Sequence, residues 1–583
     1  MKLVTGSSPL TPLLLLQIAL TIACLAIAVF RPGIGDRFFS SIEDVLRRIA
    51  HRRLAPVLVV GILPLALRAL LLPVYAVPTP SVHDEYGYLL QADTFASGRL
   101  TNPTPPSPRH FESIYILTKP TYNSQYQPAQ GMLLAFGTWL ANLPWLGVLL
   151  SMGLLAALFY WMLCAWLSRV WALVGALLAI FQYGVLSYWM NSYFGGSIPA
   201  IGGTLVLGAL PRLRAHARAR EAVLCAIGIV ILMNSRPVEG ALLLCVSAGA
   251  LFYWVFIQRL VPFDVSCRRV FGPIAAIVIL GAGFDLYYNY RVTGKPTEMP
   301  YMLSRNLYGT VQGYFFEKPY YVKTAMPGDI RMEYEKQLEN HARRNSSRGL
   351  ALATGGKIRT FWNFYLGPAL TIPLLLCPFI WRGPNMGIVA VSLVLVGFEN
   401  LTFHAYQPHY TAPVAGLVLL MVVLGFERLR RLRSAGLFLS RTLPIVCALG
   451  LLIPMSGRFI QSELPQHFSG LAHFWASEFQ STWPREQLRA QLLNEGGKDL
   501  VFVRYRYPEH NLDNEWVFNR ANLDEAKIIW ARELDSESNL RLIERFPGRR
   551  IWLGEPDLRP PRIGPYPPAI AAPLEPVKSI ISR

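Results

Sequence analysis

The chain has 583 residues, of which 52% are hydrophobic and only 16% are charged. About a quarter of the residues of a soluble globular domain are charged, so this composition excludes an ordinary soluble protein. The formal net charge of +19 suggests a nucleic-acid partner, but the arginines lie in short loops between apolar runs, which indicates membrane topology and no nucleic acid.

Apolar runs close to the ~20 residues that cross a bilayer recur from residue 11 to residue 458. They predict an all-α polytopic membrane protein with about twelve transmembrane helices. The expected spans are residues 11–30, 54–77, 145–167, 171–190, 198–210, 222–233, 241–257, 270–288, 362–381, 386–402, 412–426 and 442–455.

The arginine-rich segments are residues 47–53, 212–220, 259–269 and 428–433. Loops rich in Lys and Arg face the cytoplasm, and the spans then alternate without conflict. The first apolar run has features of a signal peptide, but an Arg-rich segment follows it directly. We therefore expect a retained first span with its N-terminus outside.

A polar, proline-rich outer loop over residues 78–128 follows the second span. Helical spacing over residues 84–97 predicts an amphipathic helix at the membrane interface, ended by Gly98. Residues 130–142 form a short apolar segment, which predicts a partial or re-entrant helix.

A second outer loop is expected over residues 289–360, with a charged helical patch at residues 331–344. Beyond residue 458 the apolar runs stop. Residues 499–503 and 550–553 are typical of buried strands, whereas residues 522–533 and 539–546 carry helical or mixed patterns. The chain thus divides into a first span and basic loop (1–54), a transmembrane domain (55–458) and an outer α/β domain (459–583).

This topology places several polar clusters on the outer face together with Asp84 and Glu85. Those clusters are residues 191–196, 236–240, 287–295 and 404–409. Paired carboxylates at a membrane boundary are suited to general base catalysis, because each raises the pKa of the other. Acidic residues at the start of a solvated helix explain Asp84 and Glu85 equally well.

Candidate cations for an anionic ligand are Arg236, Lys119, Lys295 and His409, in that order. An outer arginine close to the bilayer suits a lipid phosphate, although an ion pair between Arg236 and Glu239 has equal weight. Lys119 fits an interfacial lysine, and the tyrosines before Lys295 fit an aromatic belt.

The remaining candidate ligand-binding residues are Tyr122, Tyr126, Asn191, Tyr193 and Tyr410. The glycines of segment 191–196 allow a close backbone approach, but a tight turn explains them as well. No metal site is assigned: His404 and His409 lack a metal-binding spacing, and the seven cysteines show no CxxC motif.

An acidic pair directly after a span, an interfacial helix and a Pro-Gly re-entry together resemble the GT-C membrane glycosyltransferases. Protein O-mannosyltransferases and the aminoarabinose transferase of lipid A belong to that group. The resemblance covers residues 55–460 in topology. Its motifs are densest at residues 83–131, 191–196 and 236–240.

The resemblance implies transfer of a sugar from a polyprenyl-phosphate carrier to a lipid, glycan or protein acceptor, with inversion. Asp84 would be the base, and Glu85 would orient it or tune its pKa. The site would face the periplasm or exterior of a bacterial cytoplasmic membrane. Pro408-His409-Tyr410 stands where the group usually has an Arg-Tyr pair. Some members need a divalent cation and others do not, so the resemblance leaves a cation open.

Two other classes of function stay open. A transporter or flippase of lipid-linked sugars usually needs ionisable groups near the midplane, but charged residues inside the expected spans are few, with Arg68 and Asp285 as the clearest exceptions. An assembly or receptor protein would use its outer tail to bind partners, and it would give the paired carboxylates no role.

Overall fold

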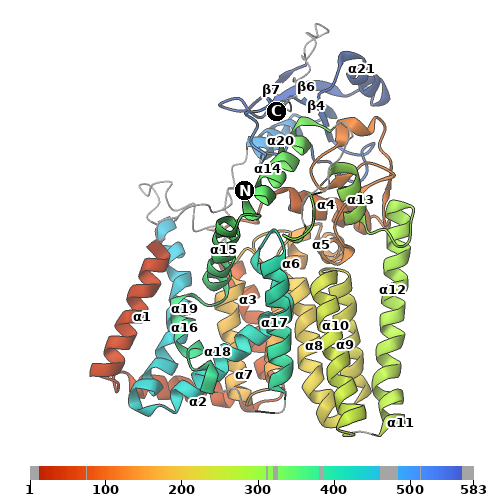
Figure 1. Cartoon of the computed structure of the whole chain (residues 1–583). Helices are drawn as coiled ribbons and strands as arrows, with labels where there is room; N and C mark the ends of the chain where they lie inside the picture. The colour runs from red at the N-terminus through yellow and green to blue at the C-terminus, as the bar shows by residue number, and fades with distance from the viewer. Residues whose placement is uncertain are drawn as a thin grey trace.

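The computed structural model describes residues 12–566 except 74, 261, 310–312, 320–325, 380–382, 384, 460–483 and 513. Residue 11 of the first expected span, residues 380 and 381 of the span 362–381, and residues 460–483 and 567–583 of the expected tail lie outside the described residues. Figure 1 shows a bundle of long helices with a smaller α/β unit above it, and shorter helices between the two.

Helices of 8 to 27 residues form the bundle in Figure 1. They are α1 (Pro12–Phe30), α2 (Asp36–His51), α3 (Ala55–Leu70), α6 (Pro144–Leu163), α7 (Arg169–Ala179), α8 (Ser197–His216), α9 (Ala219–Met233), α10 (Pro237–Phe252), α12 (Gly272–Thr293), α15 (Ser347–Tyr365), α16 (Gly367–Leu374), α17 (Met386–Thr402), α18 (Ala415–Arg430) and α19 (Arg433–Phe459). Helix α11 (Phe263–Ser266) is a short element before α12.

Within the described residues, four helices are long and apolar enough to cross a membrane: Pro144–Leu163, Pro237–Ile257, Phe263–Thr293 and Ala412–Arg430. Two bent pairs, α2 with α3 and α15 with the segment Gly367–Phe379, raise this number to six. The chain is therefore a multi-pass membrane protein. The expected number of about twelve spans exceeds this count and stays a prediction.

Two expected spans are shorter as helices than their apolar runs. The run 54–77 is helical as Ala55–Leu70, because the guanidinium of Arg68 binds the carbonyls of Tyr75 and Ala76 and stabilises a turn there. The run 171–190 leaves helical structure after Gly184, where the amide of Asn191 binds the carbonyls of Val185 and Ser187. Side chains thus replace the backbone bonds that would continue each helix.

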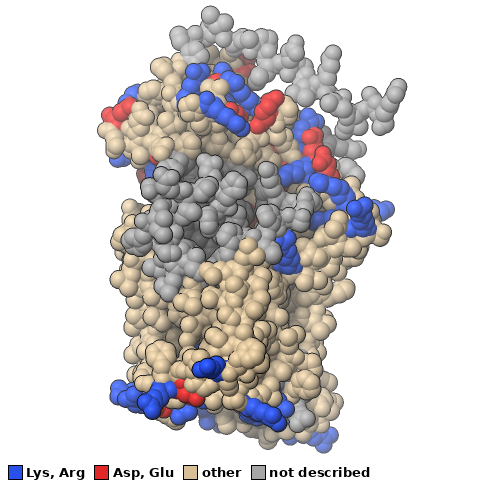
Figure 2. All heavy atoms as spheres, turned by 90° about the vertical axis from the view of Figure 1, so that its left-hand side faces the viewer, with Lys and Arg blue, Asp and Glu red and all other residues tan. Residues whose placement is uncertain are grey.

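The basic segment 31–53 contains a helix, α2, where a loop was expected. Glu43 in α2 accepts hydrogen bonds from Arg430 at 2.6 and 2.8 Å and from Arg441 at 2.8 Å. These ion pairs fasten α2 to α18 and α19. Figure 2 shows Lys and Arg gathered at this end and again near the α/β unit, with a wide belt of other residues between.

The first outer loop folds into several short elements. They are α4 (His83–Ala96), β1 (Asn102–Pro103), η1 (Pro108–Phe111), β2 (Ile116–Leu117), β3 (Thr121–Ser124) and α5 (Pro128–Ala141). Helices are present at both places where the sequence predicts them, α4 and α5, and their position relative to the membrane stays a prediction. Gly98 has a φ of +72°, which explains why glycine follows the end of α4.

The second outer loop is largely helical. It contains the end of α12, then α13 (Pro300–Tyr308), α14 (Gly328–Arg344) and the first turns of α15. The expected charged helix corresponds to α14. The expected span 362–381 is interrupted, because α15 ends at Tyr365 and the chain bends by 93° into the following helical segment.

The C-terminal unit is a mixed sheet in the order β5–β4–β6–β7, flanked by helices. Its elements are α20 (Pro484–Asn494), β4 (Asp499–Val503), β5 (Ile528–Arg532), α21 (Ser536–Arg545), β6 (Arg550–Glu555) and β7 (Arg562–Pro565). The helical or mixed pattern expected over residues 522–533 is wrong for its second half, because buried Ile529, Trp530 and Ala531 belong to β5, the edge strand that pairs with β4.

Candidate active site

The first turn of α4 carries the acidic pair on the side of the bundle that adjoins the C-terminal unit. Val82 is the N-cap in an extended conformation, and Asp84 and Glu85 occupy the first turn, where the helix dipole favours negative charge. The two carboxylates point to different surroundings and make separate sets of contacts.

Asp84 lies among tyrosines. Its Oδ1 accepts a hydrogen bond of 2.7 Å from the hydroxyl of Tyr126. The ring of Tyr126 stacks on Tyr88, with centroids 4.6 Å apart, and meets Tyr115 edge-on at 5.8 Å. Such aromatic faces offer stacking surfaces for a sugar or acyl group near the carboxylate.

The charge state of Asp84 follows from this environment. Burial raises the pKa of the Asp84 carboxyl, whereas the bond from Tyr126 and the positive charge of Arg236 oppose the rise. Asp84 therefore combines a raised basicity with partners that keep the ionised form accessible, as a general base requires.

Arg236 is the cation that the fold brings close to Asp84. It is the N-cap residue of α10, and its guanidinium carbon lies 4.0 Å from the ring centre of Tyr410. Its Nη1 is 3.9 Å from Glu239 Oε1, one turn along the helix. The arginine is thus positioned by an aromatic face and a carboxylate, with about a quarter of its side chain exposed.

His409 lies beside Arg236 but is not a cation. Its Nδ1 is 2.9 Å from the hydroxyl of Tyr188, and its backbone N–H donates to the same oxygen at 3.0 Å. Burial and the charge of Arg236 hold the pKa of His409 well below its usual range. A neutral His409 cannot supply positive charge here, whereas the neighbouring Arg236 carries it.

Glu85 joins three parts of the chain. Its Oε2 accepts hydrogen bonds from the N–H groups of Ser81 at 2.6 Å and Val82 at 3.2 Å, and its Oε1 accepts from the N–H of Tyr193 at 2.9 Å. The side chain is 1% exposed, and burial raises its pKa to about 7 against these hydrogen bonds. Glu85 stabilises the loop junction and does not point toward Asp84's tyrosines.

Asn191 and Tyr193 stabilise the backbone of segment 191–196. Asn191 Oδ1 accepts from Arg68 Nε at 2.8 Å, and the hydroxyl of Tyr193 donates to the carbonyl of Pro78 at 2.8 Å. Gln130 of α5 donates to the carbonyl of Tyr193. The structure brings these residues next to the site as its supporting frame.

Three predicted residues lie elsewhere. Lys119 is exposed at the turn between β2 and β3, and Lys295 pairs with Glu298 at 3.3 Å beyond the end of α12. Tyr122 is 3% exposed and packs with Leu90. In the described part of the chain, no ion pair links either lysine to the carboxylates around Arg236.

Sequence reasoning missed Tyr88, Tyr115 and Glu399. Tyr88 stands one turn after Asp84, a spacing that already placed it on the same helix face. Glu399 near the end of α17 interacts electrostatically with Glu239 and Arg236. An acidic residue within an apolar run was the available signal for it. Tyr115 had no local signal, since it joins the site through the fold of the loop.

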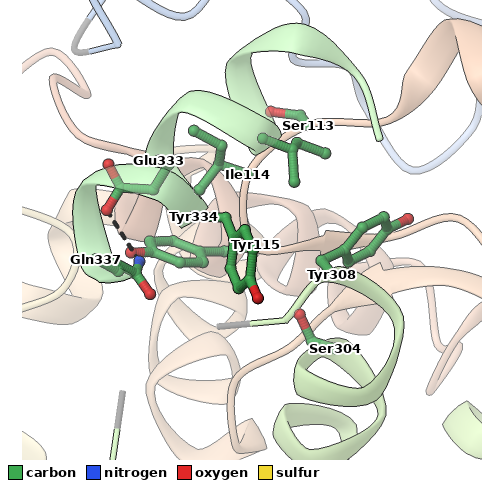
Figure 3. Close-up of a pocket in the computed structure, with 9 residues that line it drawn as sticks. Ser113, Ile114, Tyr115, Ser304, Tyr308, Glu333, Tyr334 and Gln337 are labelled. Carbon is green, nitrogen blue, oxygen red and sulfur yellow. Dashed lines mark hydrogen bonds between the residues drawn. The ribbon is translucent and has the colours of Figure 1, made fainter. Parts of the chain in front are cut away.

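A pocket adjoins this tyrosine cluster. It is lined by Ser113, Ile114, Tyr115, Ser304, Tyr308, Ile330, Glu333, Tyr334 and Gln337. Figure 3 shows the rings of Tyr115 and Tyr334 side by side, between α14 and the first outer loop. The pocket shares Tyr115 with the surroundings of Asp84.

No metal-binding site is formed by the described residues. They contain no group of three or more His, Cys, Asp and Glu side chains placed to hold a metal ion. Asp84 accepts a hydrogen bond from Tyr126, and Glu85 accepts hydrogen bonds from backbone N–H groups. Glu239 forms an ion pair with Arg236. Among the residues that the structure describes, these carboxylates therefore do not fit a divalent cation, and no step is assigned to one.

Comparisons with protein-family models and with curated proteins found no match. Among solved structures, the chain is similar to ArnT from Cupriavidus metallidurans bound to undecaprenyl phosphate, with 12% identity, a TM-score of 0.47 and coverage of 86% of this chain and 93% of that one. It is also similar to the oligosaccharyltransferase of Archaeoglobus fulgidus, with 10% identity, a TM-score of 0.41 and coverage of 86% and 69%.

A third similarity is to the arabinofuranosyltransferase AftD from Mycobacteria, with 14% identity, a TM-score of 0.41 and coverage of 78% of this chain and 30% of that one. At these identities and TM-scores, assignment of a function depends on the residues around Asp84 and Arg236.

Proposed function

We propose that the protein is a GT-C-type glycosyltransferase. It transfers a sugar from a polyprenyl-phosphate donor to an acceptor on the outer side of a bacterial cytoplasmic membrane. The observation that carries the proposal is that Asp84, hydrogen-bonded to Tyr126, interacts electrostatically with Arg236 at the edge of an apolar helix bundle. A base and an anion-binding cation at a membrane boundary suit a reaction that releases a lipid phosphate.

In the proposed reaction, ionised Asp84 takes the proton of an acceptor hydroxyl or amine. The acceptor atom then attacks the anomeric carbon from the face opposite the leaving group. A bond forms between acceptor and sugar, and the bond from the anomeric carbon to the phosphate oxygen breaks with its electron pair. The product is inverted at the anomeric carbon, and Asp84 holds the proton.

Arg236 is the proposed partner of the departing phosphate. Its guanidinium offers donors that match phosphate oxygens, and Tyr410 and Glu239 fix its orientation. Stabilising the charge that develops on a leaving group is typically the largest contribution to such catalysis. Glu85, Asn191 and Tyr193 support the site, whereas the stacked Tyr88 and Tyr126 offer a surface for a sugar ring.

We also infer the topology, the domain division and the transferred group. The chain crosses the membrane about twelve times, with its arginine-rich end in the cytoplasm. Residues 1–54, 55–458 and 459–583 are a first span with its basic loop, a transmembrane domain and an outer domain. The transferred group is a hexose or a pentose.

The test uses a strain that lacks the gene and carries either the wild-type protein or a variant. Glycans and lipid-linked sugars of each strain are profiled, and the expected result is that Asp84→Asn loses the transferred sugar while the lipid-linked donor accumulates. Asp44→Asn is the matched control, since Asp44 is an exposed carboxylate on α2 at the opposite end of the bundle.

Unchanged glycan transfer by a normally folded Asp84→Asn protein would refute the assignment of the base. A flippase predicts a different pattern. It would move sugar-lipids across the membrane of vesicles that contain no acceptor, whereas a transferase leaves them unchanged under that condition.

A further inference from the structure

The first turn of α4 holds consecutive side chains in three different directions. His83 faces the C-terminal unit, Asp84 faces Tyr126, and Glu85 faces the backbone of Ser81, Val82 and Tyr193. Successive residues of an α-helix are about 100° apart around its axis, so any rotation of α4 moves all three together. The orientation of Asp84 therefore depends on contacts made by its neighbours.

One face of α4 rests on the C-terminal unit. It consists of His83, Tyr86, Leu90 and Asp93, at the spacing of neighbours along a helix face. Ring nitrogen Nε2 of His83 lies 2.5 Å from the carbonyl of Leu512, and the ring of Tyr86 lies 4.8 Å from that of Phe518. Leu90 packs in one apolar cluster with Ala521.

The far end of this face is an ion pair. Asp93 accepts a hydrogen bond of 2.7 Å from Arg520 and another of 2.7 Å from the N–H of Ala521. The Asp93 side chain is 20% exposed and that of Arg520 is 68% exposed. Arg520 is therefore a position where one contact can be removed with little disturbance of the core.

The C-terminal unit is itself fixed to the outer loops. Phe111 of the first loop is 1% exposed and completes an apolar core that contains Leu500 and Phe502. Arg532, at the end of β5, forms a buried ion pair of 2.7 Å with Asp329 of α14. A unit held in this way provides a firm support for α4.

We propose that the C-terminal domain is a positioning element for Asp84, with His83, Asp93 and Arg520 as positioning residues. This inference rests on the proposed function of Asp84. The domain holds α4 at the rotation that presents Asp84 to Tyr126 and Arg236. A misplacement of about 1 Å can cost on the order of 10²-fold in rate, so loss of these contacts lowers turnover without removing a reacting group.

The first measurement needs no substrate. Hydrogen exchange is compared between wild type and Arg520→Glu, as full-length proteins in lipid nanodiscs. Arg520→Glu sets a like charge against Asp93, so peptides covering His83–Ala96 are expected to exchange faster, with those of α6 and α8 unchanged. Arg541→Glu is the control, because Arg541 pairs with Glu537 on the exposed side of α21 in the same domain.

The second measurement uses the same variants in a transfer assay with lipid-linked sugars extracted from the strain that lacks the gene. Arg520→Glu is expected to lower kcat about tenfold or more with the KM for the lipid-linked donor unchanged. Arg520→Lys restores most of kcat, because it keeps the charge opposite Asp93.

Each outcome decides the question. Unchanged exchange in α4 would show that the domain does not hold the helix. Faster exchange with unchanged kcat would show that the held orientation does not matter for transfer. Full transfer by Asp84→Asn would instead overturn the proposed function. Hydrogen exchange does not depend on transfer, so it would still show whether the C-terminal domain holds α4.

Discussion

Asp84 and Glu85 are neighbours in the sequence, but the fold gives them unlike surroundings. Glu85 is almost fully buried and accepts hydrogen bonds from backbone N–H groups, whereas Asp84 is bonded to a tyrosine hydroxyl near a guanidinium. A carboxylate surrounded by backbone donors is suited to holding a loop junction. A carboxylate beside a hydroxyl and a cation is suited to proton transfer.

Tyr126→Phe is expected to move the acidic limb of the pH–rate profile to higher pH. The hydroxyl of Tyr126 donates to ionised Asp84 and so lowers the pKa of Asp84, against the increase caused by burial. Without that hydroxyl the pKa of Asp84 increases further, and a higher pH is needed to ionise the base. The profile of kcat/KM against pH, measured with Tyr122→Phe as control, checks this.

At high pH the Tyr126→Phe protein regains a rate near that of wild type, because Asp84 is then ionised in both. A limb that stays in place, or that moves to lower pH, contradicts the role of Tyr126.

Arg236→Gln is expected to reduce kcat by about 10²–10³-fold, the usual effect of removing a donor that stabilises a developing negative charge. Arg236→Lys retains the charge but not the planar fork that lies on Tyr410, so it recovers part of the loss. Single-turnover transfer rates measure both variants. Equal rates for Arg236→Gln and wild type would remove Arg236 from the reaction.

At the scale of elements, helix α4 was predictable and its surroundings were not. Helical spacing and Gly98 indicated a helix over residues 84–97, and the structure has it at His83–Ala96. Tyr115 and Arg236 reach Asp84 only through contacts far apart in the chain. Local periodicity does not determine such contacts, so Lys119 and Lys295 were proposed as phosphate ligands only from their residue type and their predicted place on the outer face.

Element ends were mispredicted where side chains bind the backbone. The apolar runs 54–77 and 171–190 continue past Leu70 and Gly184, but Arg68 and Asn191 bind carbonyls there and end the helices. The sequence did not predict strand β5, because a short apolar run is compatible with both a buried strand and a helix.

Close packing of α8 gives a prediction at the same scale. A Cβ at Gly203 would lie 1.7 Å from the carbonyl oxygen of Pro413, whereas one at Gly249 in α10 would meet nothing within 4 Å. Gly203→Ala is therefore expected to lower the unfolding free energy by about 1–3 kcal/mol or more, since a well-packed backbone must move. Gly249→Ala, the matched control, raises it by about 0.5–1 kcal/mol.

Thermal unfolding in one detergent, followed by tryptophan fluorescence, compares the two glycine variants. A Gly203→Ala protein as stable as Gly249→Ala would contradict the close approach of α8 to the segment before α18.

At the scale of the whole molecule, the arrangement of charge was predictable from the sequence. The basic segments 47–53, 212–220 and 428–433 fall at the ends of α2, α8 and α18, away from the C-terminal unit. Charge bias and run length indicate orientation because they act on whole segments. The docking of the C-terminal unit on α4 was not predictable, since it depends on single contacts such as Arg520 with Asp93.

The orientation predicts a labelling pattern in intact cells. Arg541→Cys in α21 and Arg47→Cys in α2 place thiols at side chains that are 58% and 54% exposed in wild type, so accessibility is matched. A membrane-impermeant maleimide is expected to label residue 541 from outside, and residue 47 only after the cells are opened. Labelling of residue 47 in intact cells would show that the chain has the opposite orientation in the membrane.

The most direct test of the central claim is transfer by purified protein in nanodiscs, with extracted lipid-linked sugar as donor and the acceptor identified by glycan profiling. Ionised Asp84 is the proposed base, and loss of a general base typically costs about 10²–10⁴-fold. Asp84→Asn is therefore expected to release polyprenyl phosphate at least ~100-fold more slowly than wild type, with donor binding unchanged. Release at the wild-type rate by a folded Asp84→Asn protein would contradict the account.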